Sequence, residues 1–502
     1  MATIDTSRRI KHRDYTYLGL TQSLCPQCKV VVPAKIIARG KRVYFRKQCP
    51  EHGVREDFIC SDVARYDMLE TSLPAKLPQQ TAVEPQRGCP LDCGLCSEHE
   101  QHTCIAVLEI TDGCNLTCPM CYAGSAPGKQ HKSLDEIRKQ IDTIVAAEGR
   151  VEVVQLSGGE PTLHPQLLEA IEYALSQPID YVMINTNGIR LAHDRGLVDA
   201  LAVHRQRLEI YLQFDAVDDS AMQQLRGQAG LLDIKLKALD NIERAGLNVT
   251  LVSTLQGGVN DSAPADLVAF AQQRECVTGL SFQPATYSGR YLLPDELERR
   301  ITFPDVIDTI AGDSRNAFTA DDFVPLPCAH PNCHWISLAA RDGDRLLPLT
   351  QFVDAKANLD LLANGISFTR EKTEQLARQL VARMSCGEDG CCTPSATPDT
   401  ASLSSLPVLN EAELSNAQTN NDRQLVEKFL QDAIAQSVGA RDILRITITS
   451  FLDVYNFDLR RVMKCCTHHV LPSGHIIPFC AYNVLYRDGT VPLANLAEKI
   501  SG

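Results

Sequence analysis

Three cysteines within residues 111–122 have a spacing that could support demanding chemistry. Cys114, Cys118 and Cys121 follow the pattern C-x3-C-x2-C. Three thiolates can hold three irons of a [4Fe–4S] cluster and leave the fourth iron an open coordination position, whereas clusters that only carry electrons are usually closed by a fourth Cys. The spacing therefore predicts a cluster whose open iron binds a reactant directly, although a zinc site is the alternative.

The segment 151–161 supports the cluster interpretation. Its first half is an apolar run that predicts a buried strand, and the strand ends in Gly158, Gly159 and Glu160. The two glycines would let the backbone approach a ligand closely. The carboxylate of Glu160 could accept a hydrogen bond from an ammonium group.

Together, the two patterns resemble the signatures of the radical S-adenosylmethionine (SAM) superfamily. In that superfamily the open iron chelates the amino and carboxylate groups of SAM, and an electron from the cluster cleaves a sulfur–carbon bond to release a 5′-deoxyadenosyl radical. The resemblance implies that the cysteine triplet is catalytic and binds the cluster. It also implies that SAM is bound by Met120, Gly158, Gly159 and Glu160. Met120 stands where the family often has an aromatic residue, and we expect it to pack on the adenine.

Alternating apolar runs and amphipathic helices predict the scaffold between residues 105 and 300. Strand candidates begin near residues 105, 151, 181, 208, 247 and 277. This order predicts an α/β fold with a partial (β/α)6 barrel, whose ligands gather at the carboxyl ends of the strands. By resemblance, polar residues at these ends should bind the ribose and carboxylate of SAM. The candidates are Asn187, Asp215 and Ser253, each of which could also be an ordinary turn or cap residue.

The residues before the barrel contain two further groups of cysteines. In residues 1–72, Cys25, Cys28, Cys49 and Cys60 predict a small module that holds one Zn or Fe ion, with His52 competing with Cys60 as the fourth ligand. In the connector at residues 73–104, Cys89, Cys93 and Cys96 repeat the C-x3-C-x2-C spacing, and Cys104 can close the set. We expect an auxiliary [4Fe–4S] cluster there, with a zinc knuckle as the alternative.

Cysteines after the barrel predict a third cluster. Its expected ligands come from residues 301–392 and from a C-terminal cluster domain at residues 425–502, and they are Cys328, Cys333, Cys466 and Cys480. Cys465 is an alternative to Cys466. Residues 393–424 are rich in Ser, Thr, Pro, Asn and Ala, which predicts a flexible linker or a long surface loop. No role is assigned to Cys386, Cys391 and Cys392.

Composition limits the compartment and the partners. Twenty Cys would suggest disulfides in a secreted protein, but the first ten residues lack an apolar signal segment and the cysteines form metal-type clusters. We therefore expect a reducing, cytoplasmic location. No apolar run approaches the roughly 18 residues of a spanning helix, so any membrane contact would be peripheral. The net charge of −13 disfavours a nucleic-acid groove as the main surface.

The order of all these features resembles a multi-cluster radical SAM family that includes archaeal tetraether lipid synthase and members described as pterin methyltransferases. The resemblance implies three [4Fe–4S] clusters, one mononuclear metal and a reductant such as flavodoxin or ferredoxin. It also implies hydrogen abstraction from an unactivated sp3 carbon, followed by coupling of lipid chains or by methyl transfer to a pterin-like molecule. An iron–sulfur electron-transfer protein is the alternative from another class. A lipid would need a long apolar tunnel, and a pterin a compact pocket with convergent polar groups.

Overall fold

The computed structural model of the protein describes residues 13–73, 76–351 and 438–496, together with isolated positions between 354 and 432. Residues 393–423 lie outside the described residues, as do Cys386, Cys391 and Cys392, so the linker there stays a prediction. Within the described part, no helix has the length and apolar character needed to cross a membrane.

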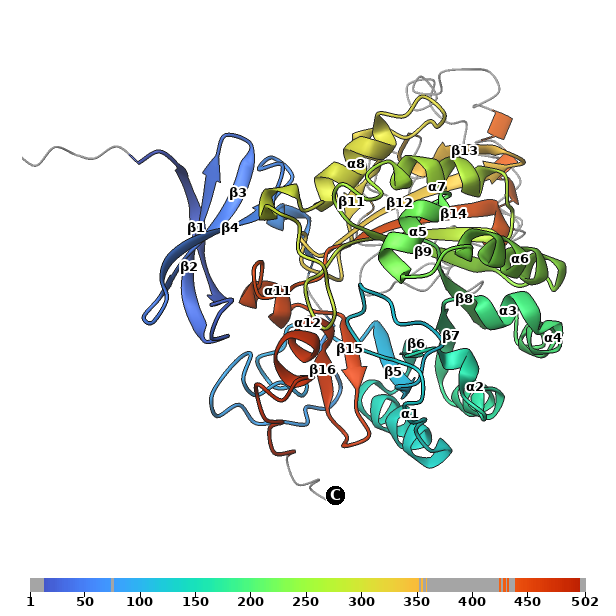
Figure 1. The fold of residues 1–502 in the computed structure, drawn as a ribbon, viewed down its shortest axis with the longest axis horizontal. Coiled ribbons are helices and arrows are strands. Elements are labelled where there is room, and N and C mark those ends of the chain that lie inside the picture. Colours follow the sequence, from blue (N-terminus) through green and yellow to red (C-terminus); the bar gives the residue numbers. More distant parts are fainter. Residues whose placement is uncertain are drawn as a thin grey trace, which may run out of the picture.

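The N-terminal module is a four-stranded antiparallel sheet, drawn in blue in Figure 1. Its strands, in spatial order, are β1 (Thr16–Leu24), β2 (Val31–Arg39), β3 (Arg42–Cys49) and β4 (Gly53–Cys60). Because neighbouring strands are also consecutive in the chain, the β1–β2 turn and the β3–β4 turn lie at the same end of the sheet. The cysteines of this module are concentrated in these two turns.

Six parallel strands form the barrel, which confirms the predicted α/β fold class. In order they are β5 (Ile105–Thr111), β6 (Val151–Gly158), β7 (Ile179–Thr186), β8 (Leu208–Gln213), β9 (Val249–Leu255) and β10 (Val277–Pro284). The strands are almost continuously buried, since helices cover one face and the barrel interior lies on the other. Their carboxyl ends therefore meet at one rim.

The helices between the strands have the local signals that the sequence provides. Helix α1 (Leu134–Glu148) begins at a capping box between Ser133 and Glu136 and buries Ile137, Ile141 and Ile144. The other helices of the barrel region are α2 (Leu167–Ser176), α3 (Ile189–His193), α4 (Arg195–Ala202), α5 (Asp219–Arg226), α6 (Leu231–Arg244), α7 (Ala263–Gln272) and α8 (Phe303–Ala311).

The C-terminal residues extend the barrel sheet at both of its edges. Strand β14 (Ile443–Thr449) pairs in parallel with β10, and β15 (Thr467–Val470) pairs in parallel with β5. The remaining strands are β11 (Val324–Pro325), β12 (His334–Asp342) and β13 (Arg345–Pro348) beyond β14, and β16 (Ile476–Pro478) beyond β15. The chain between β14 and β15, which includes α11 (Leu459–Met463), therefore runs from one edge of the barrel to the other. Helix α12 (Phe479–Ala481) and a π-helical turn (Tyr482–Tyr486) follow β16.

Candidate active site and metal centres

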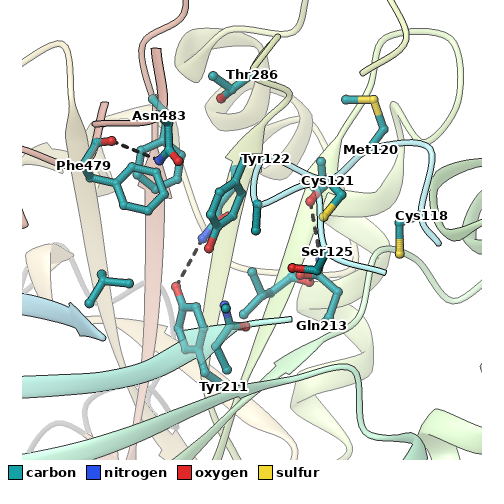
Figure 2. Close-up of a pocket in the computed structure, with 18 of the residues that line it drawn as sticks. Cys118, Met120, Cys121, Tyr122, Ser125, Tyr211, Gln213, Thr286, Phe479 and Asn483 are labelled. Atoms are coloured by element: carbon teal, nitrogen blue, oxygen red, sulfur yellow. Dashed lines mark hydrogen bonds between the residues drawn. The ribbon is translucent and has the colours of Figure 1, made fainter. Parts of the chain in front are cut away.

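A cavity of about 210 Å³ opens at the carboxyl ends of the barrel strands and reaches into the barrel. Its wall combines the loop after β5, the ends of β6 to β10 and residues of the C-terminal segment. Figure 2 shows Cys118 and Cys121 on one side of this space and Phe479 and Asn483 on the other. This is where the predicted ligand site should lie in a parallel α/β sheet.

The cysteine triplet Cys114, Cys118 and Cys121 lines this cavity, and each thiol is partly buried. Arg290 fixes the loop, because its backbone exchanges hydrogen bonds with Cys121 (2.8 and 3.0 Å) and its Nε donates to Cys118 O at 3.1 Å. Burial raises the pKa of Cys114 to about 11, so metal binding there would displace a proton. Three thiols on one ordered loop, facing one cavity, fit a cluster with an open iron.

Gly158 and Gly159 bring the end of β6 against the cysteine loop. The amide of Gly159 donates to Thr111 O at 2.7 Å, and Gly158 has a φ of +112°. A Cβ atom would lie 2.1 Å from Thr111 O at the first glycine and 2.0 Å from Gly113 O at the second. Both glycines line the cavity, so their close approach to a ligand stays a prediction, while the contact that requires glycine here is with the backbone of the cysteine loop.

Glu160 is buried and orders the polar groups around it. Its Oε1 accepts hydrogen bonds from Thr162 N, Thr162 Oγ1 and Thr186 Oγ1 at 2.6–3.1 Å. Its Oε2 accepts only one, from Asn187 N at 2.7 Å. Asn187 Nδ2 in turn donates to Asn115 Oδ1 in the cysteine loop at 2.7 Å. Glu160 and Asn187 both line the cavity, and Oε2 has capacity left for a ligand.

Asp215 and Ser253 do not line the cavity, so the structure does not support their predicted contact with SAM. Asp215 is fully buried and binds Arg226 at 2.5 and 2.7 Å, while Ser253 Oγ donates to Asp215 O at 2.8 Å. Successive side chains of a strand point to opposite faces, so Thr254 faces the cavity and Ser253 faces away. Burial would raise the pKa of Asp215, but the Arg226 guanidinium overcomes this and holds that pKa below its usual value.

Two buried cations in the cavity wall, Arg226 and Lys235, were missed by the sequence analysis. Lys235 Nζ donates to Asn187 O at 3.2 Å and also to Gln213 O. Burial lowers the pKa of Lys235 to about 8. A signal for this lysine existed, since it lies on the apolar face of α6, where the helical period groups Leu231, Lys235, Ala238 and Ile242.

Met120 also lines the cavity, from the cysteine loop. Its side chain is buried against Leu225, Ala285 and Tyr287, and its sulfur accepts a hydrogen bond from Leu292 N at 3.2 Å. The thioether is therefore held in place at the cavity wall, where a flat ring could pack on it.

The wall opposite the triplet is polar and aromatic (Figure 2). Tyr211 donates to Ser281 Oγ at 2.6 Å and accepts from Gln283 Nε2 at 3.4 Å. The rings of Tyr122 and Phe479 meet edge to face at 5.3 Å. Further polar side chains that line the cavity are Gln155, Asn185, His334, Thr449, Thr467 and Asn483.

The N-terminal turns bring Cys25, Cys28, Cys49 and His52 together, with ligand atoms within 4.8 Å of one another. Cys28 Sγ lies 3.8 Å from Cys49 Sγ, and His52 Nδ1 lies 3.5–3.6 Å from the sulfurs of Cys25 and Cys49. Ligands at about 2.3 Å in a tetrahedron stand about 3.8 Å apart. The donor set therefore fits one Zn or Fe ion.

His52, not Cys60, completes this set, which corrects the predicted ligand. Strand β4 has 8 residues, so its two ends lie about 24 Å apart at about 3.4 Å per residue. His52 precedes the strand and Cys60 ends it. The Cys60 thiol instead donates to Asp62 O at 3.5 Å, and burial raises its pKa to about 12.

The structure also redistributes the auxiliary cysteines. Cys89, Cys93 and Cys96 line a small cavity with His99, without Cys104. Cys104 instead lies with Cys328 and Cys466, because its backbone amide donates to Cys466 O where β5 meets β15. A second small cavity is lined by Cys333, Cys465, Cys466 and Cys480. Two predicted ligand sets are therefore corrected. Cys104 does not join Cys89, Cys93 and Cys96, and Cys328 does not line the cavity of Cys333 and Cys480.

Comparisons with known proteins give matches along nearly the whole chain. Residues 108–271 match the radical SAM superfamily, and residues 17–61 match the HMPTM N-terminal zinc ribbon domain. The chain is 30% identical over 498 residues to 7,8-dihydro-6-hydroxymethylpterin dimethyltransferase from Methanocaldococcus jannaschii. This match covers 93% of this chain and 94% of that protein. The chain belongs to the radical SAM superfamily. Membership confirms the predicted radical SAM enzyme class, with a [4Fe–4S] cluster and SAM as cofactors.

Other known proteins match a smaller share of the chain. A GTP 3′,8-cyclase from Chlorobaculum tepidum is 29% identical over 223 residues, or 42% of this chain and 65% of that protein. Among solved structures, Streptococcus suis SuiB aligns with 41% of this chain and 45% of its own, with 16% identity and a TM-score of 0.34.

Proposed function

We propose that this radical SAM enzyme transfers methyl groups to an unactivated sp3 carbon of a pterin-like heterocycle. The observation that carries the proposal is the single cavity in which the cysteine triplet faces a polar and aromatic wall. The similarity to a protein named as a dihydropterin dimethyltransferase supports the same substrate class. A reductant such as flavodoxin or ferredoxin would supply the electron.

The chain's own residues would hold SAM on the triplet side of the cavity. Cys114, Cys118 and Cys121 would bind the cluster, which supplies the electron that breaks a sulfur–carbon bond of SAM. Glu160 Oε2 keeps capacity for the SAM ammonium, and the Lys235 ammonium offers a partner of opposite charge to the SAM carboxylate. The Met120 thioether would pack on the adenine.

The opposite wall would hold the heterocycle. A pterin presents donors and acceptors along one edge, and the side-chain amides of Gln155, Gln283 and Asn483 offer both kinds of group. Aromatic rings such as Tyr122 and Phe479 suit a flat ligand. If a methylene chain bound here, these polar groups would lose their hydrogen bonds to water and gain none in return. The lining of the cavity therefore supports a heterocycle rather than a lipid chain. Coupling of lipid chains stays a prediction.

Anaerobic turnover with a pterin tests the proposal. The reconstituted enzyme is incubated with SAM, a strong reductant and 6-hydroxymethyl-7,8-dihydropterin, and the products are analysed by mass spectrometry. We expect 5′-deoxyadenosine and methionine from one SAM, and a methylated pterin with S-adenosylhomocysteine from a second SAM that gives up its methyl group. A carbon label in the SAM methyl group shows whether SAM is the methyl donor.

A matched pair of variants assigns the heterocycle wall. Gln283→Leu should raise the KM for the pterin while SAM cleavage continues, and Gln273→Leu, at an exposed position, should change neither. Lipid extracts that are modified while every pterin tested is returned unchanged would contradict the proposal.

A further inference from the structure

Three buried cysteines from distant parts of the chain converge at the start of the barrel. The sulfur atoms of Cys104, Cys328 and Cys466 lie within 4.8 Å of one another. Their side chains are 0%, 1% and 2% exposed. Such a group of buried thiols, brought from three segments, is typical of a closed metal site.

The backbone holds the three cysteines in this arrangement. Cys104 and Cys466 directly precede the paired strands β5 and β15, and Cys466 O accepts hydrogen bonds from Cys104 N (2.8 Å) and Ile105 N (3.1 Å). Gln101 Nε2 donates to Cys328 O and ties the third segment to the same place. The sheet therefore sets the positions of the thiols.

His102 offers a further donor beside the thiol of Cys104. Its Nε2 lies 3.6 Å from Cys104 Sγ, and its Nδ1 lies 3.6 Å from Glu148 Oε2. Glu148 is buried, its Oε1 accepts from Thr103 N at 2.8 Å, and its Oε2 has no hydrogen-bond partner among the residues that the structure describes. A histidine that binds a metal through one ring nitrogen commonly directs the other at a buried carboxylate.

We infer that Cys104, Cys328 and Cys466 bind one mononuclear Zn or Fe ion, in addition to the ion of the N-terminal module, and that the His102 ring, which lies beside Cys104 but outside the group of sulfurs within 4.8 Å of one another, turns toward the ion as its fourth ligand. The spacing of the three sulfurs, within 4.8 Å of one another, supports one ion, because ligands of a single tetrahedral metal stand about 3.8 Å apart. Thiolates of a [4Fe–4S] cluster each bind a different iron and therefore lie farther apart. Four protein ligands leave no open position, so the site is structural.

The ion would join three parts of the molecule at one edge of the barrel. Cys104 belongs to the connector, Cys328 to the segment after the barrel, and Cys466 to the C-terminal hairpin. Cys89, Cys93 and Cys96 then remain for one auxiliary cluster, and Cys333, Cys465 and Cys480 for another, each beside its own small cavity.

Counting metal against labile sulfide tests the site. Anaerobically purified Cys328→Ser protein should lose about one metal ion per chain and no sulfide, as measured by plasma mass spectrometry and a sulfide assay. Cys276→Ser, at a buried cysteine outside these groups, is the control and should lose neither. A loss of about four irons together with sulfide would show an iron–sulfur cluster instead, and an unchanged metal content would also overturn the inference.

A milder variant keeps the test informative if Cys328→Ser does not fold. Glu148→Gln leaves all four ligands in place but weakens the orientation of His102. We expect about 10–100-fold weaker retention of the metal against a chelator. Glu172→Gln, at an exposed helical position, should match the wild type. Equal retention by the two variants would remove His102 from the ligand set.

Discussion

The chain contains the spacing C-x3-C-x2-C twice, and the fold surrounds the two copies differently. Cys114, Cys118 and Cys121, the barrel triplet, follow strand β5 and line the large cavity at the strand ends. Cys89, Cys93 and Cys96, the connector triplet, precede β5 and line a small cavity that the C-terminal residues 462, 463 and 478 help to enclose. The same local spacing therefore lies in different surroundings. An open iron at the barrel triplet would face the large cavity at the strand ends, whereas an open iron at the connector triplet would face a small, enclosed cavity.

The neighbouring side chains sharpen this contrast. The barrel triplet lies beside Glu160, Arg226 and Lys235, which can bind the charged groups of a ligand. In the connector triplet, Tyr486 covers the loop, since its hydroxyl accepts from Cys93 N at 3.0 Å and donates to Pro90 O at 2.7 Å. These surroundings favour ligand chemistry at the barrel triplet and an electron-carrying role at the connector triplet, which is enclosed by protein.

The largest expected effect comes from removing one cysteine of each triplet. Cys118→Ala should reduce formation of 5′-deoxyadenosine to background, because the barrel triplet would hold the SAM-binding cluster. Cys93→Ala should lose iron but still bind SAM, as measured by the change that SAM causes in the paramagnetic resonance spectrum. If the two variants behave the other way round, the roles assigned to the triplets are wrong.

A glycine beside each triplet gives the next effect. Gly159→Ala places Cβ 2.0 Å from Gly113 O, a backbone atom, so the barrel loop must move. Gly94→Ala places Cβ 2.5 Å from a methyl group of Val83, a side chain that can turn aside. We expect Gly159→Ala to lower the free energy of unfolding by about 1–3 kcal/mol and Gly94→Ala by less. Chemical denaturation of the two metal-free variants checks this, and equal losses would contradict it.

A smaller effect, on SAM binding, is expected when two lysines of helix α6 are substituted in turn. Lys235 lines the cavity and Lys237 is exposed. Lys235→Met should weaken SAM binding about tenfold, since a hydrogen bond to a charged group is worth about 1.5–3 kcal/mol. Lys237→Met should leave the dissociation constant for SAM unchanged.

The pH dependence of SAM binding tests the same lysine. Burial lowers the pKa of Lys235 to about 8, so the ammonium loses its proton as pH rises through that value. The affinity of the wild-type protein for SAM should therefore fall between about pH 7 and 9. Lys235→Met should show no such fall, and a parallel decline in both proteins would assign the titration to another group.

The smallest effect on SAM cleavage is expected in the N-terminal module, far from both triplets in the sequence. Cys25→Ser should lower the melting temperature of the protein, because a structural ion contributes directly to folding, while formation of 5′-deoxyadenosine changes little. Cys60→Ser is the control and should retain the bound ion, as it lies outside the ligand set. Loss of the ion in Cys60→Ser but not in a His52→Ala variant would restore Cys60 as the ligand.

Features that depend on local sequence were predictable here. The periodicity of apolar residues in strands and helices predicted the barrel. The spacing of Cys114, Cys118 and Cys121 predicted the loop that lines the cavity. The errors concern partners that only the assembled sheet defines. Cys104 joins Cys466 because β5 and β15 pair over a long sequence separation. Ser253 faces away from the cavity because of strand alternation, which a motif search does not consider.

The two C-terminal strands at the barrel edges have a consequence for the order of synthesis. While the ribosome is still making residues before 443, β5 and β10 have open edges, which are templates for pairing with other chains. Both edges are covered only when β14 and β15 have emerged. Cys465, Cys466 and Cys480 emerge over the same interval. Completion of the sheet and completion of the auxiliary metal ligands therefore both wait for residues 443–480, so a nascent chain stalled before residue 443 would expose the barrel edges and lack these ligands.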